Sequence, residues 1–460
     1  MLHCVLKMTQ ALKSTPEERA RFGARCREKV RRVDQSEWDG KQRSFDPVEL
    51  ILDCNRTRMK ELMPIKMARM AASPFGFYRG AVPLMVEDLN PIPTTGIHVQ
   101  ICGDAHVRNL GAYAAPDGQL VFDINDFDET TYAPWEWDVK RFAASVILAG
   151  RESGNTEKSC KDAVTAFVEA YRKTLQALSK LSIINLFRFQ VRHHMNSAPI
   201  LSILRKAERA TPQHNLQKLT QPVKDGWRQF IESKPLLTHV TSATVRHVLG
   251  SLRQYRETLS NERLHFFDQY KPHDVCFKVV GTGSVGTRDY VVLFSGNGPQ
   301  DALFLQIKEE PESAWTRARA HVNAHPHDPS AAIHQGRRVV EGQRRMQAQS
   351  DPFLGWTTID DREYLVRQLS DHKAGIEPGD LKGKELQDYT TVCGEVMAKG
   401  HARSGDACVL SGYCGRNDKL DKAIVKFAVA YADQTEHDHE KFLAAVKRGK
   451  IKCDFKGAGV

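Results

Sequence analysis

The chain has 460 residues, of which 41% are hydrophobic and 27% are charged, and this balance excludes a disordered, collagen-like or disulfide-stapled protein. Lysine and arginine exceed aspartate and glutamate by 66 to 56, so the net charge is +10 and an anionic substrate, cofactor or surface is favoured as partner. The longest uncharged apolar run, residues 142–150, is far shorter than the roughly 20 residues that span a bilayer. We therefore expect a cytoplasmic protein with no membrane span.

Residues 1–44 are predicted to form a basic N-terminal arm. Within this arm, residues 1–33 contain nine lysines and arginines but only three acidic residues. Charge runs of this kind are usually solvated, so we expect an exposed basic helix or a frayed arm. A nucleic-acid-binding arm would also show interleaved aromatic residues or a groove-reading motif, and neither is present. Nucleic-acid binding is therefore the least favoured function.

Residues 45–270 are predicted to form a mostly helical lobe. The apolar runs 98–102 and 119–123 indicate two strands, and the glycine-, asparagine- and proline-bearing stretch between them indicates a loop. The next segment, 133–150, places apolar side chains at three- and four-residue steps, which predicts an amphipathic helix packed on that loop. The same periodicity predicts a second helix over 160–182.

Residues 271–372 are predicted to form a small antiparallel β lobe. Three β-branched and apolar runs, 275–280, 289–294 and 302–308, follow one another with turn residues between them. A helical pattern and a further strand follow these runs. The segment 373–460 is again helical and is expected to complete the helical lobe, so the fold class predicted for the chain is α+β.

The first candidate site combines Asp104, Asn109, Asp126 and Asp128. A hairpin of the two strands predicted around this loop would bring Asp104 and Asn109 next to Asp126 and Asp128. Such hard oxygen ligands suit Mg²⁺, and a remaining carboxylate can orient or deprotonate a hydroxyl nucleophile. Ordinary turn chemistry is the alternative, because aspartate and asparagine are common in tight loops. The four acids within 123–129 would repel one another without a cation, which favours a catalytic or metal site.

The second candidate site is the GxGxxG pattern formed by Gly281, Gly283 and Gly286. The pattern alone fits dinucleotide-binding folds and kinase glycine loops equally well. A dinucleotide fold needs a helix after the third glycine, whereas the run that follows here, 288–294, is typical of a strand. A glycine turn between antiparallel strands lets backbone N–H groups approach a phosphate closely. A flexible hairpin tip is the alternative.

The third feature is Lys308, near the end of the third strand of the β lobe. A lysine in this position reaches the α- and β-phosphates of a nucleotide when a carboxylate on a helix holds it. Glu341 is the best candidate for that carboxylate, although it lies 33 residues later in the chain. The alternative is an exposed lysine at a strand end and an unrelated surface glutamate.

These motifs resemble the protein-kinase-like superfamily, and the segment GDAHVRN is most similar to the catalytic loop of aminoglycoside and choline phosphotransferases, including the histidine at His106. Longer strings, such as SPFGFYRG, FDINDFDE and WEWDVKRFAAS, resemble the bacterial family called domain of unknown function 2252 over about 45–445. The kinase-like relation implies a two-lobed fold in permuted order, because the catalytic loop here precedes the glycine loop. Cys102 replaces the usual histidine before the Gly-Asp pair, and Asp-Phe-Asp replaces the usual Asp-Phe-Gly.

The resemblance also implies a role for each candidate residue. Asp104 would accept or orient the acceptor hydroxyl, Asn109 and Asp126 would hold Mg²⁺, and Asp128 would be a further metal ligand. Lys308, paired with Glu341, would contact the α- and β-phosphates of ATP beneath the loop of Gly281, Gly283 and Gly286. Arg79, in the segment SPFGFYRG, is either an extra anion ligand or a buried structural arginine, and the second role is favoured.

Three functions are consistent with these residues. The first is an ATP- and Mg²⁺-dependent phosphotransferase that acts on a hydroxyl of a small molecule. The second is a nucleotidyl transferase that uses the same pocket to transfer AMP, and the third is a non-catalytic nucleotide-binding pseudokinase. The sequence does not identify the acceptor, the orientation of the nucleotide or the oligomeric state.

Overall fold

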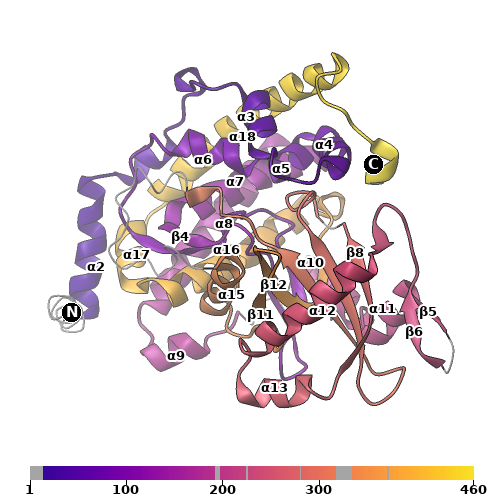
Figure 1. Cartoon of the computed structure of the whole chain (residues 1–460). Coiled ribbons are helices and arrows are strands. Elements are labelled where there is room, and N and C mark those ends of the chain that lie inside the picture. Colours follow the sequence, from indigo (N-terminus) through magenta and orange to yellow (C-terminus); the bar gives the residue numbers. More distant parts are fainter. Residues whose placement is uncertain (1–13, 192–196, 224–225, 280, 317–333, 370–371) are drawn as a thin grey trace.

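The computed structural model describes residues 14–191, 197–223, 226–279, 281–316, 334–369 and 372–460. These residues form helices and antiparallel sheets, which confirms the predicted α+β class. A layer of helices and a six-stranded sheet lie side by side, and a set of short strands lies among the helices (Figure 1). No helix within the described ranges is both long enough and apolar enough to cross a bilayer.

The first described helices begin at strong capping signals. Their bounds are Pro16–Arg25 (α2), Pro47–Cys54 (α3), Met63–Ala71 (α4), Pro74–Gly80 (α5) and Val82–Leu89 (α6). In α2, α3 and α5 the first residue is proline, and the preceding threonine, aspartate or serine accepts a hydrogen bond from a backbone N–H of the first turn. These pairs satisfy amides that have no partner within the helix, and proline has no such amide to satisfy.

The described part of the N-terminal arm forms a helix with exposed basic side chains, as the charge run predicts, but one side of this helix is docked on the protein. Helix α2 packs on α17 (Ala407–Cys414), and Gly23 lies buried against that helix. Arg19 pairs with Asp406 at 2.7 Å, and Arg27 donates a hydrogen bond to the Tyr413 carbonyl at 2.9 Å. Arg19 and Arg27 therefore bind the opposing helix, whereas Arg21 and Arg25 are exposed. Residues 1–13 of the arm lie outside the described part of the chain.

Four short strands carry the loop with the first candidate site, and they pair differently from the predicted hairpin. Their bounds are His98–Ile101 (β1), Leu110–Ala114 (β2), Leu120–Ile124 (β3) and Thr131–Pro134 (β4). Strand β1 pairs with β4, and β2 pairs with β3, so the first predicted strand does not pair with the second. The reason is local: the turn Pro116-Asp117-Gly118 closes β2 on β3 after only five connecting residues, and that turn is the stronger hairpin signal.

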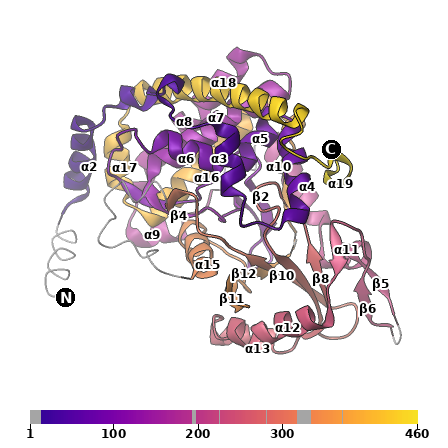
Figure 2. The same cartoon turned by 45° about the horizontal axis from the view of Figure 1, so that its top comes forward.

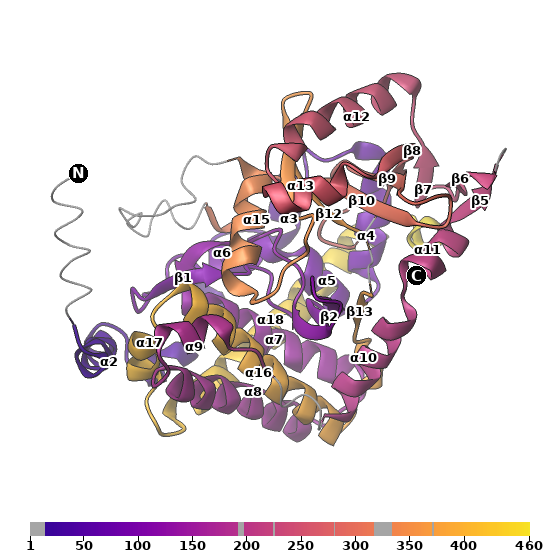
Figure 3. The same cartoon turned by 90° about the horizontal axis from the view of Figure 1, so that it is seen from below.

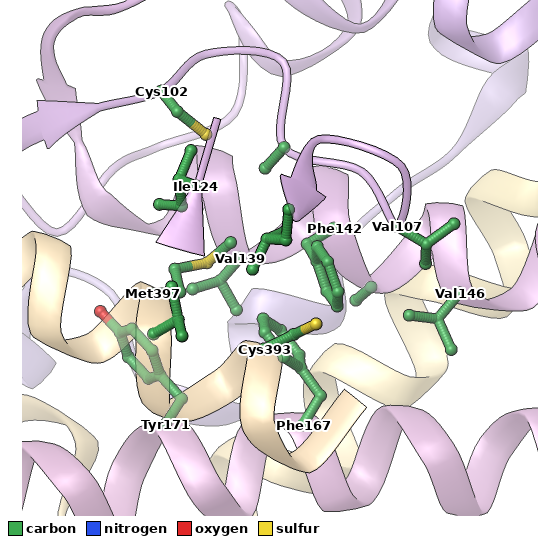
Figure 4. Packing of buried hydrophobic residues seen from close by; sticks show 14 of the residues in the cluster. Cys102, Val107, Ile124, Val139, Phe142, Val146, Phe167, Tyr171, Cys393 and Met397 are labelled. Atoms are coloured by element: carbon green, nitrogen blue, oxygen red, sulfur yellow. The ribbon is translucent and has the colours of Figure 1, made fainter. Parts of the chain in front are cut away.

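Helix α7, Trp135–Glu152, is the centre of the helical layer. Every side chain from Trp135 to Gly150 is buried, so the helix is not amphipathic as predicted but enclosed on all sides. Its apolar side chains, Val139, Phe142 and Val146 among them, meet Phe167 and Tyr171 of α8 (Glu157–Leu178) in one continuous core (Figure 4). The predicted second helix over 160–182 is confirmed by α8.

The remaining helices of this layer come from later in the chain. Their bounds are Ile183–Arg188 (α9), Ala198–Arg209 (α10), Lys384–Ser404 (α16), Ala407–Cys414 (α17), Lys419–Lys447 (α18) and Phe455–Ala458 (α19), whereas α11 (Pro212–Leu219) packs on the six-stranded sheet. Helix α16 packs on α8, and the long helix α18 packs on α7 and crosses the layer (Figure 2). The short helix α19 then returns to α4. The C-terminal segment is therefore part of the same helical core as α7 and α8.

The six-stranded antiparallel sheet has the order β11-β12-β10-β9-β8-β7. Its strands are Leu237–His239 (β7), Lys271–Lys278 (β8), Asp289–Ser295 (β9), Ala302–Glu309 (β10), Gly355–Ile359 (β11) and Arg362–Gln368 (β12). Strands β8, β9 and β10 confirm the three predicted runs. Two helices, α12 (Ser242–Arg256) and α13 (Asn261–Phe267), cover one face of the sheet (Figure 3).

The predicted boundary at residue 270 between the two lobes does not match this packing. Strand β7 and helices α12 and α13 lie before residue 270, yet they share an apolar core with the sheet. A single strand of three residues carries too weak a pattern to be found in the sequence. The other short elements are β5 (Thr220–Pro222), β6 (Arg228–Phe230), α15 (Gln335–Met346) and β13 (Ala374–Gly375), which pairs with β2.

Candidate active site

A cavity lies where the short strands, the glycine loop and strand β10 meet. Its lining includes the predicted site residues Asp104, Asn109, Asp126, Asp128, Gly281, Gly283 and Lys308. The two halves of this set are about 150 residues apart in the chain, and the structure brings them to one place. The lining also includes Arg58, Lys66 and Arg79 from the helical layer and Glu129, Glu309 and Glu310.

Lys308 points into the cavity because of the alternation along β10. Leu303, Leu305 and Ile307 pack under α12 and α13, so the even-numbered side chains face the helical layer. There the Lys308 ammonium forms an ion pair with Asp128, and it lies 3.5 Å from the Glu310 carboxylate. Burial disfavours the charged amine, but these two acids together raise its pKa above the ordinary value. Lys308 is therefore a buried, permanently charged group.

Glu341 is not the partner of Lys308, which corrects the prediction. Both of its carboxylate oxygens are taken by arginines on its own helix, Arg337 at 2.7 Å and Arg345 at 3.4 Å. These residues lie four positions before and after it, which is the spacing at which helical side chains meet. The acids that hold Lys308 are Asp128 and Glu310. The position of Glu310 follows from strand periodicity, since a residue two positions after a lysine faces the same side of a strand.

Asp104 is held by an arginine from the central helix α7. Arg141 donates two hydrogen bonds to Asp104 Oδ1, at 2.8 and 2.5 Å, and its guanidinium stacks over Tyr78. The second oxygen, Oδ2, lies 3.7 Å from His106 Nε2. Burial raises the pKa of Asp104 against the opposing effect of Arg141, and burial lowers the pKa of His106 well below its usual value. The arrangement is one fixed carboxylate oxygen, one open oxygen and a neutral imidazole.

Asn109 and Asp126 are oriented by the loop itself. The Asn109 amide nitrogen donates to the Asp104 carbonyl at 2.8 Å, and the Asn125 N–H donates to the Asn109 carbonyl at 3.0 Å. The first of these bonds engages only the nitrogen of the Asn109 side chain, and its oxygen accepts no hydrogen bond from the described residues. Asp126 Oδ1 accepts a hydrogen bond from the Asp128 N–H at 3.3 Å. Both residues therefore present free oxygen atoms to the cavity.

The two acids of the Asp-Phe-Asp segment have opposite pKa shifts. Burial, and next the charge of Asp128, raise the pKa of Asp126 to about 6. For Asp128 the ammonium of Lys308 and the guanidinium of Arg367 outweigh burial, so its pKa lies below the usual value. Asp128 Oδ1 and both oxygens of Glu310 are buried with no hydrogen-bond partner in the described chain. This surplus of buried oxygen donors is the chemistry that a divalent cation such as Mg²⁺ fits.

The glycine loop joins β8 to β9 and covers one wall of the cavity. Gly281 and Gly283 line the cavity with Thr282 between them, whereas Gly286 does not. Gly286 has φ +93°, and an added Cβ would collide with Met63 and Arg58. The third glycine of the motif is therefore required for packing on α4, and not for approach to a ligand as predicted.

Basic side chains from the helical layer hold the glycine loop by its carbonyl groups. Lys66 donates to the Gly283 carbonyl at 2.6 Å, and Arg58 donates to the Val285 carbonyl at 2.8 Å. Arg69 donates to the Gly281 carbonyl. Because carbonyl oxygens are engaged on the side of α4, the loop is docked on the helical layer rather than free at a hairpin tip.

Several residues that position the site were not singled out from the sequence. Asp138 of α7 accepts hydrogen bonds from the N–H groups of Cys102 and Gly103, at 2.7 and 2.9 Å. Trp315 stacks on Trp137 and donates its indole N–H to the Gly103 carbonyl at 2.6 Å. The segment WEWDVKRF contained a signal that could have identified Asp138. Its charged residues lie in a predicted helix, and charges inside a fully buried helix need partners.

The comparisons with known proteins identify a family. A family model described as "Uncharacterized protein conserved in bacteria (DUF2252)" matches residues 58–445. Neither the curated proteins nor the solved structures contain a match to the chain. The matched range covers well over half of the sequence and includes every predicted site residue that lines the cavity, so the chain belongs to the bacterial DUF2252 family.

Proposed function

We propose that the protein is an ATP- and Mg²⁺-dependent phosphotransferase with a permuted protein-kinase-like fold, which phosphorylates a hydroxyl group of a small molecule. One observation carries the proposal. The ammonium of Lys308 pairs with Asp128 in the same cavity that Asp104, Asn109 and the glycine loop line. A lysine on a strand, a metal-binding acid and a catalytic-loop aspartate in one cavity are the parts that phosphoryl transfer uses.

The metal would be held by Asn109, Asp126 and Asp128, whose free oxygens face the cavity. When bound, Mg²⁺ neutralises the charge of the nucleotide phosphates. With Mg²⁺ present, Asp126 works as an ionised ligand. Lys308 can contact the α- and β-phosphates because its charge is maintained by Asp128 and Glu310.

In the proposed transfer step, one particular oxygen of Asp104 accepts the proton of the acceptor hydroxyl. The acceptor hydroxyl oxygen attacks the γ-phosphorus, and the bond from that phosphorus to the β–γ bridging oxygen breaks with its electron pair leaving on ADP. The hydroxyl proton goes to Asp104 Oδ2, since Arg141 occupies Oδ1. Arg141 also fixes the carboxylate in place, and positioning of this kind supplies much of the rate in phosphoryl transfer.

A second candidate is nucleotidyl transfer, in which AMP is attached to the hydroxyl. It is favoured by Arg58 and Lys66, two basic side chains that line the cavity under the glycine loop. Burial lowers the pKa of both, and the charge of a bound phosphate would favour their cationic forms. A nucleotide that entered with its γ-phosphate toward these cations would present the α-phosphorus to the acceptor. The leaving group would then be pyrophosphate instead of ADP.

The test uses full-length protein, Mg²⁺ and a pool of hydroxyl-bearing metabolites, with ATP labelled at the γ- or the α-phosphate. Phosphotransfer predicts label in the product only from the γ position, and nucleotidyl transfer predicts it only from the α position. Asp104→Asn should lower kcat by about 10² to 10⁴. Glu341→Gln is the matched control, because its carboxylate pairs with Arg337 and Arg345 outside the cavity. Binding of ATP without transfer of either label would identify a pseudokinase, and no binding of ATP would contradict all three functions.

A further inference from the structure

Arg79 has none of the partners that a buried structural arginine requires. Its Nε is buried without a hydrogen-bond partner, and its side chain takes part in no ion pair with the described residues. Two arginines that are more deeply buried than Arg79 are engaged: Arg141 binds Asp104, and Arg338 donates to the carbonyls of Asp128 and Thr130. The structural role that the sequence favours for Arg79 is therefore not supported by its contacts.

Arg79 lies between the cavity and a second, more open groove. Arg79, Gly281 and Thr282 line both spaces, so the two are adjacent. The groove also has Arg108 and Glu377 on its wall. We call this second space the arginine groove.

Arg79 lacks a direct partner for its buried Nε among the described residues. Burial, and next the charge of Arg108, lower the pKa of Arg79 to about 10, and the charges of Asp104, Asp126 and Glu377 act in the opposite direction. An anion that accepted a hydrogen bond from this Nε would supply the missing partner.

Arg108 is the second cation of the groove and is easily released. It pairs with Glu377 at 2.9 Å, but its side chain is 35% exposed and that of Glu377 is 61% exposed. Ion pairs this exposed contribute little free energy. A phosphate or carboxylate that bound Arg79 can therefore take Arg108 from Glu377.

We propose that Arg79 and Arg108 form an anion subsite for the acceptor, so that the acceptor carries a phosphate or carboxylate group besides the hydroxyl that faces Asp104. This inference rests on the proposed function and names its substrate class. Arginine binds both anions through paired hydrogen bonds. An amine such as choline or an aminoglycoside carries the same charge as the groove arginines and would be disfavoured there.

The experiment is a calorimetric titration of the full-length protein with inorganic phosphate, at saturating Mg²⁺ and a non-hydrolysable ATP analogue. The nucleotide occupies the glycine loop and Lys308, so the added phosphate reports on the arginine groove alone. We expect one phosphate to bind per chain and Arg79→Gln to weaken it at least tenfold. We expect Arg108→Gln, whose side chain does not line the cavity, to leave the affinity for the ATP analogue the same. Arg205→Gln, on an exposed face of α10, is the matched control and should change neither affinity.

Three outcomes would overturn the subsite. They are no phosphate binding to the nucleotide-loaded protein, equal binding by the Arg79→Gln variant, and loss of the ATP analogue but not of phosphate in that variant. Arg108→Gln, at a partly exposed site, provides the second variant if Arg79→Gln does not fold, and should weaken phosphate about threefold or more. If the ATP analogue does not bind at all, the proposed function fails, and titration of the free protein with phosphate still tests the subsite.

Discussion

Lys308→Met is expected to destabilise the protein strongly and in a pH-dependent way. The Lys308 side chain is 3% exposed and compensates Asp128, with Glu310 3.5 Å away at 0% exposure. Methionine keeps the length of the side chain but leaves these buried acids without their cation. Breaking a buried ion pair from one side costs about 3 to 5 kcal/mol, so we expect a loss of that size in the free energy of unfolding at pH 8.

The pH dependence follows from the direction of the pKa shifts. In the wild type the pKa of Asp128 is lowered on folding, so its contribution to stability is present above the unfolded pKa and is lost only in acid. Without Lys308, Glu310 loses the cation that opposes burial and the charge of Asp128, so its folded pKa, already well above the usual value, rises further. Its contribution is then unfavourable and grows as the pH rises from the usual to the folded pKa, by up to about 1.4 kcal/mol per pH unit for each group. The loss should therefore be smaller at pH 5 than at pH 8.

Urea unfolding followed by tryptophan fluorescence at pH 5 and pH 8 measures both quantities. Lys382→Met, at an exposed lysine, is the matched control and should change the free energy of unfolding by less than about 0.5 kcal/mol. The reasoning is refuted if Lys308→Met costs under about 1 kcal/mol at pH 8, because a broken buried pair costs more. A loss that is the same at both pH values also refutes it.

Four further changes test other parts of the site. Gly103→Ala should destabilise the protein by more than about 2 kcal/mol in thermal unfolding, because φ at Gly103 is +81° and an added Cβ would overlap a carbonyl oxygen. Gly118→Ala is the control: Gly118 has a similar φ of +79° but lies in open space, so this change should cost only about 1 kcal/mol. Asp138→Asn should cost about 2 kcal/mol by urea unfolding, since an amide can accept only one of the two loop N–H bonds without turning its own donor toward the other. Glu341→Gln should cost under about 1 kcal/mol and leave nucleotide affinity unchanged by calorimetry, and a larger change would place it at the site after all. Mg²⁺ affinity should fall as the pH drops through about 6, where Asp126 takes up a proton, and Asp126→Asn should remove that dependence.

The sequence by itself determined the elements whose signals are local. Helix α8 and strands β8 to β10 lie where the periodicity places them, because a helix or strand pattern is a property of neighbouring residues. The candidate residues Asp104, Asn109, Asp126 and Lys308 were found in the same way, from spacing and residue type, and the structure places them in one cavity. Membership of the DUF2252 family was also evident from the motif strings.

Only the tertiary structure decided which of these elements meet. It paired β1 with β4 instead of β3, placed β7 and α12 on the sheet, and enclosed α7 on all sides. Partners of buried charges were decided in the same way: Lys308 has Asp128 and Glu310, Glu341 has its helical neighbours, and Arg79 has none among the described residues. The physical reason is that strand pairing and charge pairing depend on groups that lie far apart in the chain, and the free energy of each contact depends on burial that arises only when the chain is packed.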